Sequence, residues 1–85
     1  MDYFNLLVSL PHHGEMGKFQ NDRSVPPWEA THGSRWTTED LLTCAADLEA
    51  RARANTGVEW GDTRSRAINF ASAGFLRRAA ELRSR

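Results

Sequence analysis

The stretch that decides the fold reads WTTEDLLTCAADLEARARA and covers residues 36–54. Thr37 is a suitable N-cap, and Asp40 three residues later completes a weaker form of the capping box. Trp36 before the cap and Leu41 at the fourth helical position have the spacing of a hydrophobic staple. Together these signals predict an α-helix that starts directly after Thr37.

The apolar positions of this stretch recur at helical spacing. They form one stripe along the helix, which consists of Leu41, Ala45, Leu48 and Ala52. Leu42 and Cys44 flank this stripe. Asn55 and Gly57 then offer left-handed stops, so we expect the helix to end there.

A second helical segment begins near Asp62 or Thr63 and runs towards the C-terminus. Its apolar residues fall within roughly 80° of arc at about 100° per residue. They are Ile68, Ala71, Phe75, Ala79 and Leu82, with Leu76 at the edge. Two helices of this length with a short connection should pack as an antiparallel pair.

The N-terminal segment, residues 3–10, alternates between two sets of side chains. The set expected to face the helices is Phe4, Leu6, Val8 and Leu10. Such a period of two is typical of a half-buried strand, and Pro11 would end it. A lone strand needs a partner. The candidates are residues 15–20 in a hairpin, residues 57–60, and the same strand of a second subunit.

We therefore predict a single domain, residues 1–85, of the α+β class. An N-terminal strand or β-hairpin packs against two antiparallel α-helices. The alternative is a mostly α-helical hairpin with strand pairing between subunits. Residues 21–35, which contain Pro26 and Pro27, are predicted to be an irregular loop pinned by Val25 and Trp28. Trp28 is either an anchor of this loop or an exposed interface residue.

The charges are balanced overall but not along the chain. The 85 residues carry 11 Lys+Arg and 11 Asp+Glu. The first 50 residues hold eight acids and three bases, a balance of −5, and the last 35 hold three acids and eight arginines, a balance of +5. No apolar run is long enough to cross a membrane, and no secretory signal is visible, so we expect a cytoplasmic protein with no membrane contact.

No motif for catalysis, a metal or a cofactor is present. His12 and His13 are adjacent and would point to opposite sides of an extended chain, which argues against a shared metal ion. Cys44 lies beside an apolar stripe and near Asp47, a poor setting for a catalytic thiolate. The glycines form no phosphate-binding or dinucleotide-binding pattern. We therefore predict a protein that is not an enzyme and holds no cofactor.

Phe70 is out of phase with the apolar stripe of the second helix. By helical angle it lies with Arg66, Ala73 and Arg77, on the side opposite Phe75. It could pack under the 21–35 loop, lie in a homodimer or partner interface, or stack on a nucleic-acid base between arginines. The candidate interface residues are Phe70, Arg66, Arg77, Arg78 and Trp28.

In general character the chain is small, single-domain, free of motifs and rich in Ala and Arg. In this general character it resembles proteins encoded by phages or mobile elements of GC-rich bacteria. Many such proteins, anti-CRISPR proteins among them, bind and block a host complex. We predict a protein-binding module, of which such an inhibitor of a host complex would be one form. The alternative is a nucleic-acid-binding accessory protein that uses the Arg-rich C-terminal helix, residues 64–85.

Overall fold

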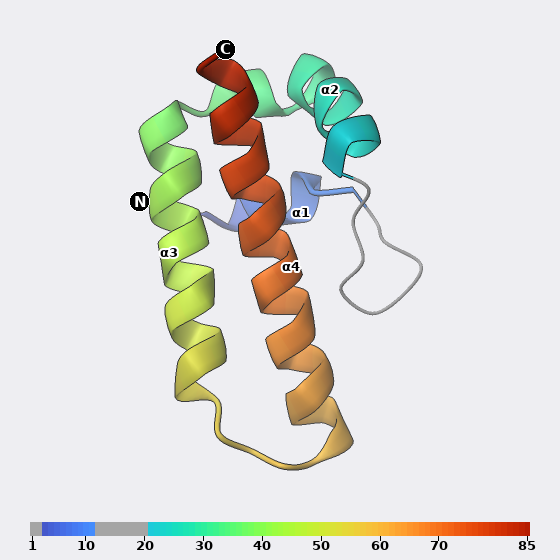
Figure 1. Cartoon of the computed structure of the whole chain (residues 1–85), viewed down its shortest axis with the longest axis vertical. Helices are drawn as coiled ribbons and strands as arrows, with labels where there is room; N and C mark the ends of the chain where they lie inside the picture. Colours follow the sequence, from blue (N-terminus) through green and yellow to red (C-terminus); the bar gives the residue numbers. More distant parts are fainter. Residues whose placement is uncertain (1–2, 12–20) are drawn as a thin grey trace.

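The computed structural model describes residues 3–11 and 21–85, and these residues form helices and connections without a strand. In chain order the elements are α1 (Phe4–Ser9), α2 (Asn21–Thr31), the 3-10 helix η1 (Gly33–Arg35), α3 (Thr38–Ala54) and α4 (Trp60–Arg83). The helices α3 and α4 lie side by side as the predicted antiparallel hairpin. Helices α1 and α2 pack near the end of the hairpin that holds the C-terminus, so the other end projects as a bare arm (Figure 1).

The predicted α+β class is wrong, because residues 4–9 form the helix α1 and not a strand. The apolar side chains of this segment fit both the period of a strand and the period of a helix. Phe4 and Val8 of the alternating set are exposed. The residues packed in or against the core recur at spacings of three and four, which is the period of a helix. They are Tyr3, Leu6, Leu7 and Leu10.

Because residues 4–9 are helical, they do not pair as a strand with any of the three proposed partners. Residues 15–20 lie outside the described residues. Residues 57–60 form the end of the connection between α3 and α4 and the first residue of α4. The alternative fold correctly contained a helical hairpin, but the segment it assigned to strand pairing between subunits is helical.

Residues 21–35 are the helix α2 followed by η1, so the predicted irregular loop is also wrong. Pro26 and Pro27 lie inside α2 and remove two backbone donors. Both prolines are exposed, so the carbonyl groups that lose a partner can be hydrated. Val25 and Trp28, three residues apart, are buried on the opposite side and pin the segment as predicted. Their burial compensates for the two missing hydrogen bonds.

Helix α3 begins as the sequence predicts. The hydroxyl of Thr37 accepts a hydrogen bond from the backbone N–H of Asp40 at 3.1 Å, and the Asp40 carboxylate accepts one from the N–H of Thr37 at 3.1 Å. Trp36 packs against the core that contains Leu41, in agreement with a hydrophobic staple. The predicted stripe of α3 is buried throughout, and Cys44 with it.

The left-handed stop predicted after α3 is wrong. Asn55 has an extended backbone, with φ −82° and ψ 101°, and Gly57 does not have a positive φ. The side chain of Asn55 instead accepts a hydrogen bond from the N–H of Gly57 at 3.1 Å. A Cβ atom at Gly57 would overlap the carboxylate of Asp62, so a larger residue at this position would displace that carboxylate from its hydrogen bond with the N–H of Glu59.

Helix α4 begins at Trp60, two to three residues earlier than the predicted start near Asp62 or Thr63. Glu59 is the N-cap residue, and its N–H donates to the Asp62 carboxylate at 3.3 Å. Asp62 is therefore the third residue of the helix and not its cap. Trp60 lies in the first turn of α4 and is exposed.

The core lies where α1, α2 and η1 cover the hairpin. Phe75 is fully buried, and the ring of Trp28 meets it edge-on with centroids 5.2 Å apart. Ala73 is also fully buried, although its helical angle had placed it on the outer side of α4. The reason is that α4 is covered on two sides in this region, by α3 and by the N-terminal elements. The largest fully buried side chains are Phe75, Leu6, Leu41, Leu76, Val25 and Cys44.

Candidate functional site

The predicted interface arginines are engaged within the chain. Arg77 donates to the carboxylate of Glu49 on α3, with Nε and Oε2 3.2 Å apart. The hydrogen bond from Arg77 holds the pKa of Glu49 below its ordinary value, and the same bond raises the pKa of Arg77. Arg78 bonds Asp22 of α2 at 2.9 Å and pairs with Glu81 at 3.0 Å. Folding therefore interleaves the acidic first half of the chain with the basic second half.

Phe70 is 42% exposed and is the remaining aromatic member of the predicted interface on α4. The guanidinium of Arg53 on α3 lies 6.0 Å from the centre of its ring. The side of α4 that carries Phe70 and Arg77 thus lies along the edge of α3, and both side chains remain partly exposed to solvent. Trp28, by contrast, is only 3% exposed and takes the role of an anchor.

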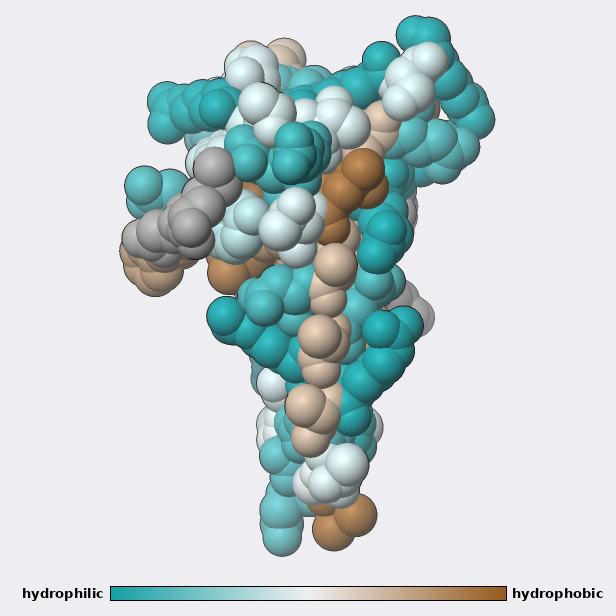
Figure 2. Space-filling model, turned by 90° about the vertical axis from the view of Figure 1, so that its left-hand side faces the viewer, coloured by the Kyte–Doolittle hydropathy of each residue, from teal (hydrophilic) through white to brown (hydrophobic). Residues whose placement is uncertain are grey.

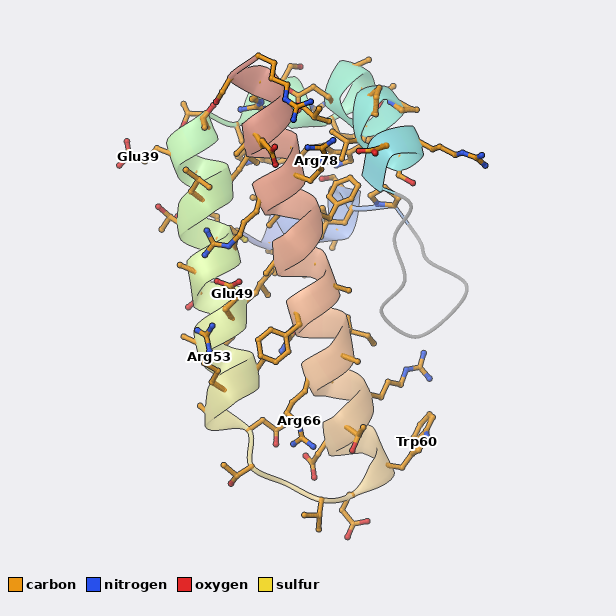
Figure 3. All side chains as sticks on the ribbon, in the orientation of Figure 1. Glu39, Glu49, Arg53, Trp60, Arg66 and Arg78 are labelled. Carbon is orange, nitrogen blue, oxygen red and sulfur yellow. The ribbon has the colours of Figure 1, made fainter. Side chains whose placement is uncertain are left out.

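A different apolar surface is found at the end of the projecting arm. Val58 is 92% exposed and Trp60 is 67% exposed. Trp60 points away from the hairpin (Figure 3), and the guanidinium of Arg64 lies 5.5 Å from the centre of its ring system. We call Val58, Trp60 and Arg64 the tip patch. In the space-filling view the arm narrows to an end where a small hydrophobic patch lies beside hydrophilic residues (Figure 2).

The backbone beneath the tip patch is held by side-chain hydrogen bonds. Arg66 reaches back along α4 towards the loop (Figure 3) and donates to the carbonyl groups of Asn55 at 2.9 Å and Gly57 at 2.6 Å. The contacts of Asn55 with Gly57 and of Glu59 with Asp62 close the loop from both ends. Arg66 therefore stabilises the backbone next to the tip patch and is not itself part of that patch. The tip patch is presented by the connection of five residues, 55–59, and by the first residues of α4.

The tip patch cannot be recognised when α4 is expected to start at residue 62 or 63, because Val58 and Trp60 then lie in a connection with no helical register. With Glu59 as the cap, Val58 lies just before the cap and Thr63 lies at the fourth helical position. A staple needs apolar residues at both positions, so Val58 has no apolar partner there. Recognising Asp62 as the third residue of a capping box would have exposed this mismatch.

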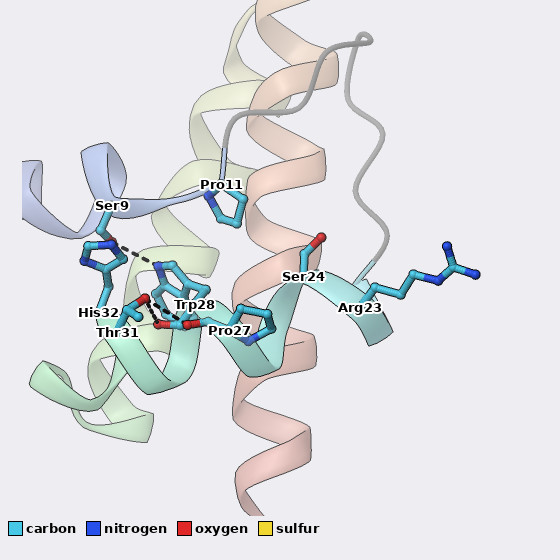
Figure 4. Close-up of a pocket in the computed structure, with 8 residues that line it drawn as sticks. All are labelled: Ser9, Pro11, Arg23, Ser24, Pro27, Trp28, Thr31 and His32. Atoms are coloured by element: carbon cyan, nitrogen blue, oxygen red, sulfur yellow. Dashed lines mark hydrogen bonds between the residues drawn. The ribbon is translucent and has the colours of Figure 1, made fainter.

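A groove of about 460 Å³ lies between α1 and α2. Its lining includes Ser9, Trp28, Thr31 and His32, while Arg23 points outward (Figure 4). The Ser9 hydroxyl donates to the Leu6 carbonyl at 2.7 Å and accepts from the Trp28 indole at 3.1 Å. These bonds give the Ser9 hydroxyl a structural role in joining α1 to α2, which does not suit a nucleophile.

Cys44 is buried, and burial, together with the nearby Asp47 carboxylate, raises the pKa of its thiol to about 11. The thiol is therefore neutral at physiological pH and packs as a small apolar group. Among residues 3–11 and 21–85, no three His, Cys, Asp or Glu side chains are grouped so that they could hold a metal ion. His12, His13 and Glu15 lie outside the described residues.

No protein family matches the chain, and comparison with curated proteins and with solved structures finds no significant match. In the described part of the chain, no helix is both long and apolar enough to span a membrane. The predicted cytoplasmic location stays a prediction.

Proposed function

We propose that the protein is a small protein-binding module that contacts its partner through the tip patch. The observation that carries this proposal is the strong exposure of Val58 in the connection and of Trp60 at the start of α4, next to backbone that Arg66 holds in place. Trp and Arg are the residues most enriched at the energetic centres of protein interfaces. A patch that combines a Trp with an Arg at the end of an arm is well suited to insertion into a pocket of a partner.

The order of the loop favours binding for an energetic reason. Each flexible side chain or loop that must be immobilised on binding costs free energy. Here the backbone carbonyl groups of Asn55 and Gly57 are already bonded to Arg66. The partner would therefore order few additional groups, and most of the apolar contact area would contribute to affinity.

The nucleic-acid alternative is less well supported, because the arginines that would bind phosphate have acidic neighbours. Arg77, Arg78 and Arg83 are each paired with a carboxylate of another element. Binding a phosphate backbone would require these pairs to open, and the full chain has no net charge to add attraction. Blocking a host complex, the role suggested by the general character of the sequence, is one form that protein binding by the tip patch would take.

Affinity capture with three variants tests the proposal. Trp60→Ala and Val58→Ser remove the tip patch, whereas Val8→Ser changes an exposed valine of α1 and is the matched control. Circular dichroism and thermal unfolding first establish that all variants fold like the parent chain. We expect the two tip variants to lose partners that the parent and the control retain at moderate salt. If folded Trp60→Ala retains the same partners, the proposal is wrong. If the captured material is lost steeply as the salt concentration rises, nucleic-acid binding is favoured instead.

A further inference from the structure

A second surface lies at the opposite end of the hairpin from the tip patch. It is a groove of about 320 Å³ between α3 and α4, which we call the hairpin groove. Leu42, which is 40% exposed, forms an apolar wall, and the nearly buried Ala80 lies beside it. The remaining lining residues are Thr38, Arg77, Glu81 and Ser84.

The charges of the hairpin groove are self-complementary. Arg77 and Glu81 are exposed, lie four residues apart on the same side of α4, and have opposite sign. Arg77 bonds Glu49 through Nε and Nη2, and Oε1 of Glu81 pairs with both Arg78 at 3.0 Å and Arg85 at 3.1 Å. Nη1 of Arg77 and Oε2 of Glu81 are the atoms that a second molecule would engage.

We propose that the hairpin groove binds a second copy of this chain around a two-fold axis. In an antiparallel arrangement of two α4 helices, Arg77 of each copy lies opposite Glu81 of the other, so the same ion pair forms twice. The small Ala80 near the axis allows the helices to approach closely, and the two Leu42 side chains cover each other. The chain has a formal net charge of zero, so no overall repulsion opposes the contact.

The proposed dimer is weak. Stable interfaces bury about 800 Å² on each partner, and a groove lined by six residues supplies less than that. We therefore expect monomers at low micromolar concentration and a growing dimer fraction as the concentration approaches the millimolar range. This self-association is independent of the tip patch, which lies at the other end of the hairpin.

Sedimentation velocity over this concentration range provides the first test. The parent chain should show a concentration-dependent shift towards the dimer, and Leu42→Ser should weaken the association about tenfold, as expected for loss of a central apolar contact worth about 1.4 kcal/mol. Trp60→Ala should associate like the parent chain. A parent chain that stays monomeric, or association that depends on Trp60 and not on Leu42, would overturn the proposal.

Exchanging the charges gives a sharper test, because the proposal then predicts both the loss of each homodimer and the formation of a heterodimer. Arg77→Glu and Glu81→Arg each place like charges opposite each other in a homodimer, so each variant alone should remain monomeric. In an equimolar mixture, the acidic groove of one variant faces the basic groove of the other, and a heterodimer should form. Circular dichroism verifies that both variants are folded. If the folded variants do not associate more strongly in the mixture than separately, the two-fold arrangement is wrong.

Discussion

Arg83 donates to both carboxylate oxygens of Glu29, with Nε and Oε1 2.6 Å apart and Nη2 and Oε2 3.1 Å apart. The same guanidinium also donates to the carbonyl groups of Gly33 and Trp36. This one side chain therefore joins the end of α4 to α2, to η1 and to the residue before the cap of α3. The pair is partly shielded from water, which makes it stronger than a surface ion pair.

Replacing Arg83 by Ala should lower the free energy of unfolding by about 1–3 kcal/mol, because it leaves the carboxylate and two carbonyl groups without their donor. Arg83→Lys should recover little of this loss, since an ammonium group cannot reproduce the planar fork of donors. Urea denaturation measures both variants. Arg85→Ala, which removes an exposed pair with Glu81, is the control and should change stability by less than about 0.5 kcal/mol. Equal effects of the two Ala variants would contradict this role of Arg83.

Thr37→Ala should destabilise the protein by about 1 kcal/mol, because it removes the hydroxyl that accepts from the N–H of Asp40. Thr43 is exposed in the interior of the same helix, so Thr43→Ala should be neutral or slightly stabilising. Chemical denaturation of the two variants separates the effect of the cap from that of a threonine in general. A midpoint of Thr37→Ala equal to that of the parent chain would mean that the cap contributes nothing.

The two phenylalanines of α4 should differ in their contribution to stability. Phe75→Ala removes a fully buried ring that contacts Trp28 and should cost about 3–5 kcal/mol. Phe70 is partly exposed beneath Arg53, so Phe70→Ala should cost only about 1 kcal/mol. Thermal or urea unfolding of both variants measures which substitution lowers the free energy of unfolding more. A loss at Phe70 as large as that at Phe75 would show that its ring is covered more completely than the structure indicates.

The ion pair of Glu49 with Arg77 should make stability depend on acid pH. Because folding lowers the pKa of Glu49, its contribution is present above the ordinary glutamate value of 4.5 and is lost as the pH falls through the lower folded value. Glu49→Gln cannot titrate, so the stability difference between the parent chain and this variant should shrink as the pH falls through that range. Urea denaturation at a series of pH values measures this difference. A difference that is constant with pH would exclude the pair as its source.

The long helices could be predicted because their signals are local. The capping of α3 by Thr37 and Asp40 joins residues three apart, and its apolar stripe needs only a partner helix to cover it. The expected start of α4, near Asp62 or Thr63, is two to three residues too late, because the pairing of Glu59 with Asp62 as N-cap and third helical residue is not evident from the apolar spacing. That error concealed the tip patch, so the sequence did not point to Val58 and Trp60 as a candidate surface.

The amino-acid sequence by itself determined α3, the apolar stripe of α4 and their antiparallel packing. Tertiary structure decided the rest. Residues 3–10 satisfy the strand period and the helix period equally, and the surface that covers Leu6 and Leu7 selects the helix. Residues 21–31 are helical despite two prolines because Val25 and Trp28 are buried. Arg83 forms an ion pair with Glu29, from which it is separated by 54 positions in the sequence. Interactions between neighbours can be deduced from their spacing, whereas a short segment takes its conformation from distant residues that bury it.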